Sequence, residues 1–403
     1  MRSEALEVVA GGGDIRSDRA EAKYFRLQYL RAVAALAVVL FHAAYYLKLT
    51  RGDDRLLAVT PANLGGFGVC LFFVISGYLM ASLANKTPPT YFIVHRIIRI
   101  YPIYWLALIG MFAASALLGH GLPLDPLAIV LLPGDHRSYV LGVEWTLPFE
   151  LSFYLVIFLI MAARSQRALP IIAILWGAAI VALTLLYPYQ QQDQFPRLAP
   201  LLVSAWTLPF VVGLLLPTAL RLGLIGRWAW MPGIALIFVM FVAPDVSAFL
   251  PAVGCFFVVG WAVAPRPSIL DADRIKLLTR FGDWSYALYL CHVPVIVLIY
   301  NKSPAYANDA LLYGVGVAAA LAASSIVGRV DLLLYGALKH RADQSGPAFR
   351  YALSSAFAII TLAYGGYAEL AAATRQEAKM IPSPPNATVV AVRVLNEDER
   401  QRK

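Results

Sequence analysis

Apolar runs of roughly twenty residues recur along this chain between short polar connections, and no other feature restricts its fold as strongly. A run of that length crosses the hydrocarbon core of a bilayer as one α-helix, because a helix rises about 1.5 Å per residue. The sequence therefore predicts an all-α fold, a polytopic transmembrane helical bundle of about ten to eleven spans. The expected spans lie at 27–47, 65–83, 101–118, 145–163, 169–186, 198–216, 229–243, 247–263, 285–300, 310–327 and 351–370.

The composition agrees with a membrane protein and argues against a soluble one. Hydrophobic residues make up 60% of the 403 residues, charged residues only 14%, and the mean hydropathy is +0.67. A soluble domain rarely carries so little charge. The net charge of +9 comes from Lys and Arg between the apolar runs, as the positive-inside rule requires, so we expect a lipid bilayer and no nucleic acid as partner. Their bias toward the N-terminal tail and alternate connections predicts a cytosolic N-terminus.

The cysteines and histidines give no sign of a metal site. Cys70, Cys255 and Cys291 lie in apolar runs and form neither a disulfide framework nor a metal-ligand spacing. The six histidines include no His-Glu-x-x-His arrangement, so no metal is expected. Residues 1–26 lack the apolar core of a cleaved signal peptide, which makes the first span an uncleaved one.

The first span carries two ionisable residues, Arg31 and His42, eleven positions apart. At about 100° per residue this separation ends roughly 20° past three full turns, so both side chains leave the same face about 16.5 Å apart. A guanidinium in hydrocarbon costs several kcal/mol, so Arg31 must face a protein interior or a wet cavity. The pair predicts a cavity that runs along this helix.

Five sequence blocks follow one another at 30–42, 68–79, 95–105, 144–154 and 281–294. In this order they resemble the acyltransferase 3 family of integral membrane O-acyltransferases. The opening Leu-Gln-Tyr-Leu-Arg most resembles the bacterial exopolysaccharide acetyltransferases of that family. Cys70 departs from the family pattern, because many members carry an acidic residue there, and Asp331 lies near the place of a usual Glu.

The resemblance implies that an acyl group, often acetyl from acetyl-CoA, is moved to a sugar hydroxyl at the bacterial inner membrane. The acceptor would belong to a cell-surface polysaccharide or its lipid-linked precursor. A transporter or flippase for a glycan or small solute, with Arg31, Glu150 and His292 along its path, is the alternative. A requirement for acyl-CoA would separate the two. The sequence does not indicate an oligomeric state.

The resemblance and the polarity of the chain together predict its organisation. Residues 1–26 form a flexible cytosolic tail, 27–345 the acyltransferase membrane domain of about ten helices, 346–371 an additional transmembrane helix, and 372–403 a polar, disordered tail. The segment 123–132 is too short to cross a bilayer and is expected to re-enter it.

His42 is the expected general base for the acceptor hydroxyl, or else the carrier of the acyl group, and a structural histidine bonded to a carbonyl is the alternative. Glu150 lies at the same expected depth, roughly 7–9 Å below the outer surface, and is predicted to orient His42 directly or through a water. Tyr154 shares the face of Glu150. The alternative is that Glu150 caps the start of its helix.

Arg96 and Arg99 precede the third span and are expected to bind the phosphates of coenzyme A, whose arm would run past Arg31 toward His42. Ordinary positive-inside charge in a loop is the alternative. Pro102 is predicted to lie in the first turn of the third helix.

Ser76 is expected either to help helices pack or to contact the acyl donor. His292, with Tyr286 and Tyr289 before it at steps of three, forms a polar stripe on the ninth span that is expected to face the cavity or a packed interior. Pro294 removes a helix hydrogen bond in this span, so nearby carbonyls need other partners.

Overall fold

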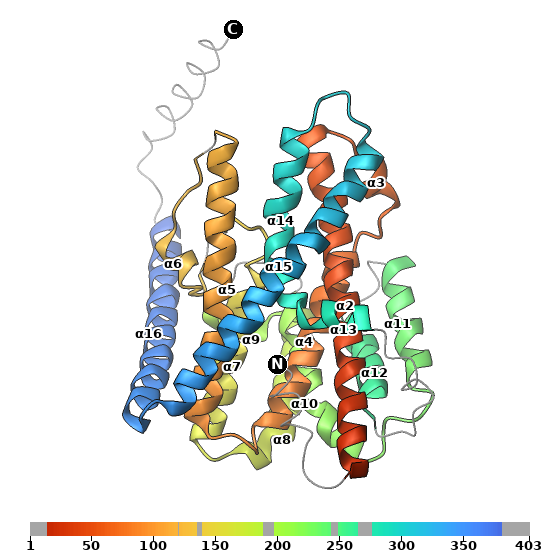
Figure 1. The fold of residues 1–403 in the computed structure, drawn as a ribbon. Helices are drawn as coiled ribbons and strands as arrows, with labels where there is room; N and C mark the ends of the chain where they lie inside the picture. Colours follow the sequence, from red (N-terminus) through yellow and green to blue (C-terminus); the bar gives the residue numbers. More distant parts are fainter. Residues whose placement is uncertain are drawn as a thin grey trace.

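The computed structural model describes residues 14–380 except 120, 135–138, 188–196, 243–248 and 265–275, with side chains from 24 to 374. Every regular element in this part is helical, and the helices run mostly in one direction (Figure 1). They are α2 Asp14–Arg51, α3 Arg55–Val59, α4 Leu64–Leu83, α5 Pro89–Leu117, α6 Pro126–Ile129, α7 Thr146–Ala162, α8 Leu169–Leu186, α9 Leu198–Val203, α10 Leu208–Arg221, α11 Trp230–Val242, α12 Leu250–Val263, α13 Lys276–Asp283, α14 Ser285–Lys302, α15 Asp309–Gln344 and α16 Pro347–Met380.

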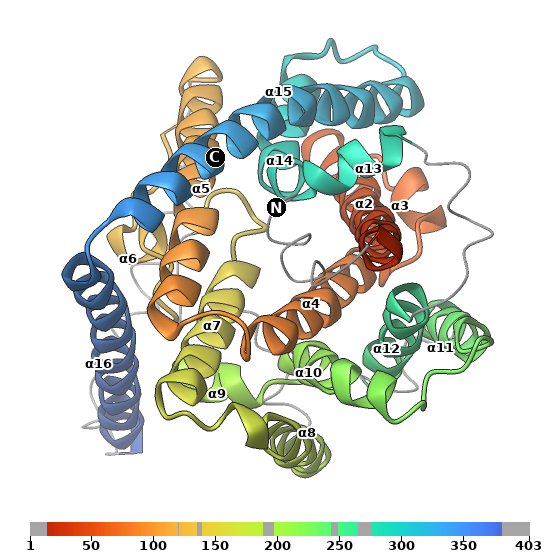
Figure 2. The ribbon, with the colours of Figure 1, turned by 60° about the horizontal axis from the view of Figure 1, so that its bottom comes forward.

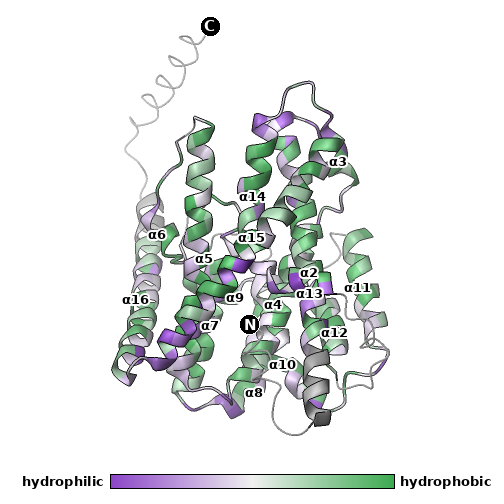
Figure 3. Ribbon diagram, viewed as in Figure 1, coloured by the Kyte–Doolittle hydropathy of each residue, from purple (hydrophilic) through white to green (hydrophobic). Residues whose placement is uncertain are grey.

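Six of the described helices are long and apolar enough to cross a membrane, or seven if the bent pair α13–α14 is one span. The shorter apolar helices are Thr146–Ala162, Ala205–Arg221, Trp230–Val242 and Leu250–Val263. Each predicted apolar run overlaps one of these helices, so the predicted all-α polytopic membrane bundle is confirmed. Figure 3 shows apolar residues along most of each helix, with hydrophilic residues near several helix ends and beside α13.

The helices that matter for the site surround a common centre. In Figure 2, α2, α4, α7, α5 and α14 form this ring, α15 crosses outside α14 and α5, and α8, α11 and α16 lie at the periphery. α4 and α10 pack so closely that only glycine fits at the contact. A Cβ on Gly77 would collide with the carbonyl oxygen of Phe210, and a Cβ on Gly213 would collide with the carbonyl oxygen of Val74. Small residues allow this approach where lipid supplies no hydrophobic driving force between helices.

Several helix boundaries differ from the predicted ones; α15, for example, ends at Gln344 and not at 327. α2 begins at Asp14, so 14–26, expected to be part of the tail, are helical, while residues 1–13 lie outside the described part. α5 begins at Pro89, with Pro88 as its N-cap, and Pro102 lies inside the helix; the prediction that Pro102 starts it was wrong. Proline suits the first turn at Pro89, and the bundle tolerates the missing donor at Pro102, as membrane helices often do.

α16 ends at Met380, beyond the expected end at 371, and residues 381–403 of the predicted tail lie outside the described residues. The segment expected to re-enter the membrane contains α6, which packs against α5. Tyr101, Tyr104 and Trp105 of α5 donate hydrogen bonds to the carbonyls of Val130, Ala128 and Ile129 at 2.9, 2.9 and 3.1 Å. These bonds tie the carbonyls at the end of this short helix to α5.

Candidate active site

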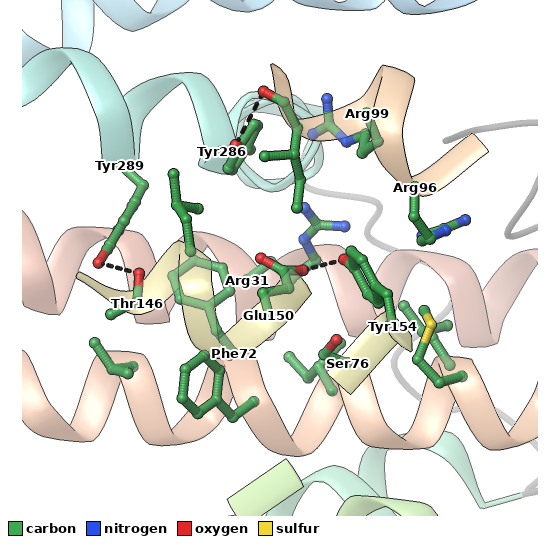
Figure 4. Close-up of a pocket in the computed structure, with 17 residues that line it drawn as sticks. Arg31, Phe72, Ser76, Arg96, Arg99, Thr146, Glu150, Tyr154, Tyr286 and Tyr289 are labelled. Atoms are coloured by element: carbon green, nitrogen blue, oxygen red, sulfur yellow. Dashed lines mark hydrogen bonds between the residues drawn. The ribbon is translucent and has the colours of Figure 1, made fainter. Parts of the chain in front are cut away.

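A cavity of about 110 Å³ lies among α2, α4, α5, α7 and α14. Eight of the ten predicted site residues line it, namely Arg31, Ser76, Arg96, Arg99, Glu150, Tyr154, Tyr286 and Tyr289. His42 and His292 are not among its described lining residues. The remaining lining is mainly apolar, so the cavity has a charged part and a hydrophobic part (Figure 4).

The arginines come from two sides of the cavity. Arg96 and Arg99 lie three positions apart on α5 and therefore share a face; they are only 9% and 7% exposed. Both residues lie within α5 and not in a loop, so the alternative of ordinary positive charge in a loop does not describe them. Arg31 reaches in from α2 and its Nε donates a hydrogen bond to Ser285 Oγ at 3.2 Å. Figure 4 places Arg31 near the centre, Arg96 toward one end, and Tyr289 and Thr146 at the opposite end.

Arg99 is held by a carboxylate from another helix. Its Nη1 lies 2.7 Å from both carboxylate oxygens of Asp331, which is 3% exposed on α15. The rings of Tyr286 and Tyr335 lie 4.8 and 5.7 Å from its guanidinium carbon. Nη2 of Arg99 has no hydrogen-bond partner among the described residues. From the sequence, Asp331 was noted only as a departure from the family pattern. Because an acidic residue in an apolar helix requires a partner, its presence there could have predicted a buried ion pair.

Glu150 accepts a hydrogen bond from Tyr154, one turn later on α7. It also lines the cavity with Arg31, and the opposite charges attract each other. No direct hydrogen bond joins Glu150 to His42 among the described residues; the carboxylate accepts from Tyr154, and the described side-chain partner of His42 is His292.

The partner of His42 is His292. His42 Nδ1 and His292 Nε2 are 3.1 Å apart, and the ring centroids 5.1 Å. His292 is fully buried, and its Nδ1 lies 3.0 Å from the carbonyl oxygen of Leu288. A carbonyl only accepts, so His292 Nδ1 carries the proton and its Nε2 is an acceptor in the neutral ring. His42 then donates through Nδ1, which leaves its own Nε2 with a free lone pair.

Arg31 and His42 both contact α14, at Ser285 and His292, as their shared face on α2 predicts. Tyr289 lies between these levels on α14. Its hydroxyl donates to the carbonyl of Val143 at 2.8 Å and is 2.8 Å from Thr146 Oγ1, so the side chain is fixed against the start of α7. The cavity therefore ends at a side chain one helical turn from the histidine pair.

The family model for the acyltransferase domain of acyltransferase 3 matches residues 24–329. Acyltransferase MdmB of Streptomyces mycarofaciens is 28% identical over 308 residues, covering 66% of this chain and 77% of that protein. Exopolysaccharide production protein ExoZ of Rhizobium meliloti is 32% identical over 137 residues, 30% of this chain and 42% of that protein. The putative acetyltransferase ORF330 of Acidianus two-tailed virus is 26% identical over 292 residues, 66% of this chain and 82% of that protein. No solved structure gives a significant match.

A multi-span helical bundle with a buried, arginine-rich cavity and a matched acyltransferase domain defines an integral membrane enzyme of acyl transfer. The chain belongs to the acyltransferase 3 family, because the family model covers most of its length. The resemblance found in the five sequence blocks is thereby confirmed.

Proposed function

We propose that this enzyme transfers an acyl group, most simply acetyl, from an acyl-CoA on the cytosolic side to a sugar hydroxyl. The acceptor is a cell-surface polysaccharide or its lipid-linked precursor, and the site is the bacterial inner membrane. One observation carries the proposal: a single cavity has arginines toward one end and, at the other, ends one turn from a hydrogen-bonded histidine pair. The similarity to the exopolysaccharide production protein ExoZ supports this acceptor class.

The charge of the cavity suits an anionic donor. Arg31 and Arg96 carry positive charge, Glu150 opposes one of them, and Asp331 neutralises Arg99. Arginine binds phosphate through charge-assisted hydrogen bonds. The diphosphate of coenzyme A would lie near Arg96 and Arg99, and its uncharged arm would run past Arg31 along the apolar lining.

The chemistry follows from the tautomer of the histidine pair. The Nε2 lone pair of His42 takes the proton of the acceptor hydroxyl while that oxygen attacks the thioester carbonyl. The carbon–sulfur bond then breaks, and the thiolate of coenzyme A leaves and recovers the proton from His42. His292 accepts the Nδ1 proton of His42 in a hydrogen bond, which strengthens while the His42 ring is charged.

The orientation follows from the charge bias of the connections, which places the N-terminus in the cytosol. α2 then carries Arg31 toward the cytosolic side and His42 toward the outer side. In this orientation the donor enters from the compartment that holds acyl-CoA, and the acceptor approaches His42 from the opposite leaflet.

Two measurements test the function. The surface polysaccharide of the source strain should carry acyl esters that mass spectrometry no longer detects after deletion of the gene. Complementation with the wild-type gene should restore these esters, and complementation with His42→Ala should not, because loss of a general base typically costs about 10²–10⁴ in rate.

The matched control is His340→Ala, since His340 lies exposed on α15 away from the cavity and should complement fully. Membrane levels of each variant are compared by immunoblot. Identical polysaccharides with and without the gene, or a purified protein that neither binds nor consumes any acyl-CoA, would favour the transporter instead.

A further inference from the structure

Phe72 of α4 lies where the three hydrophobic clusters of the bundle meet. The first cluster is centred on α5, α7 and α10, the second on α4 and α12, and the third on α2, α14 and α15. Phe72 packs against all three, yet it remains partly exposed because one side of its ring lines the cavity. A change in the size of this side chain therefore changes the space in the part of the cavity next to Tyr289.

Tyr289 lies between the lining of the cavity and His292, and Phe72 lies beside Tyr289. The ring centroids of Phe72 and Tyr289 are 6.2 Å apart in an edge-to-face arrangement, and the ring of Tyr289 lies 6.2 Å from that of His292. Two hydrogen bonds fix the hydroxyl of Tyr289, whereas the contacts of Phe72 are apolar.

We infer that Phe72 limits the size of the acyl group that this enzyme transfers. The inference rests on the proposed function and deepens it. If the arginine end binds the phosphates, the thioester lies toward the opposite end, on the side of Phe72 and Tyr289. The cavity is small, about 110 Å³, and the Phe72 ring forms part of its apolar wall, so each further methylene of the acyl group competes with this ring for space.

The test compares acyl donors of increasing length. The kcat/KM for acetyl-, propionyl- and butyryl-CoA is measured for the purified wild-type enzyme, Phe72→Ala and Phe72→Leu. One methylene in an apolar pocket changes kcat/KM by about 10–200-fold. The wild type should prefer acetyl by a factor of that order per methylene, Phe72→Ala should remove most of this preference, and Phe72→Leu should remove part of it.

Phe67→Ala is the matched control, because Phe67 lies on the same helix and is partly buried against Phe241 without lining the cavity. Its acyl preference should equal that of the wild type. Phe72→Leu keeps the test decisive if Phe72→Ala does not fold. An unchanged preference in Phe72→Leu, or a wild type that already uses butyryl-CoA as well as acetyl-CoA, would overturn the inference while the proposed function stands. A wild type that uses no acyl-CoA would instead overturn the proposed function.

Discussion

The contact between His42 and His292 makes a quantitative prediction for His292→Phe. Phenylalanine preserves much of the ring volume in this fully buried position but cannot accept the proton of His42 Nδ1. A hydrogen bond to a charged group contributes about 1.5–3 kcal/mol. If this hydrogen bond stabilises mainly the charged His42 ring of the transition state, its loss raises the activation free energy by that amount. At about 1.36 kcal/mol per factor of ten, kcat should fall about 10–150-fold.

The assay is steady-state release of coenzyme A at saturating acetyl-CoA, with the acceptor polysaccharide present. The KM for acetyl-CoA should remain near the wild-type value, because His292 is not among the described residues that line the cavity. His292→Gln is the informative companion, since a glutamine side-chain oxygen lies near the position of Nε2 and can accept the same proton. It should recover a large part of the lost kcat.

The reasoning fails if His292→Phe turns over at the wild-type rate, or if His292→Gln is as slow as His292→Phe. The first result would mean that the His42 tautomer needs no partner, and the second that His292 supports only the packing of α14. Thermal unfolding in detergent identifies variants that are slow because they are unstable.

The arginine cavity makes two further predictions. Arg96→Ala combined with Arg99→Ala should raise the KM for acetyl-CoA more than it lowers kcat, and an unchanged KM would argue against phosphate binding at this end. Asp331→Asn leaves the buried Arg99 without its carboxylate and should reduce the free energy of unfolding by about 3–5 kcal/mol. Asp343→Asn removes a partly exposed pair with His95 between the same two helices, and should cost about 1 kcal/mol or less; equal losses would contradict the importance of burial.

Much of the architecture could be predicted from the sequence, because the length and composition of each apolar run indicate that it lies in the membrane. Burial in lipid needs only length and apolarity, so the eleven runs predicted helices without knowledge of their neighbours. Helical periodicity likewise placed Arg31 and His42 on one face, and both contact α14. The start of α5 was missed because the charges of 95–99 resemble a polar connection, although the tertiary structure buries them.

The contacts between helices could not be predicted in the same way. Depth along a helix follows from residue counting, but the identity of the neighbouring helix depends on the packing of the whole bundle. For this reason the hydrogen bond between His42 and His292 was not predicted, although the sequence singled out both residues. Arg99 and Asp331 are 232 positions apart in the sequence, so no local sequence pattern predicts their ion pair.

This long separation has a consequence for how the protein is made. Ribosomes add about 5–20 residues per second, so the carboxylate of Asp331 follows Arg99 into the membrane roughly 10–50 s later. During that interval α5 carries a guanidinium that lacks its final counter-ion, which is costly in hydrocarbon. A nascent chain that stops before α15 therefore keeps an unneutralised charge on α5, which the arrival of α15 removes.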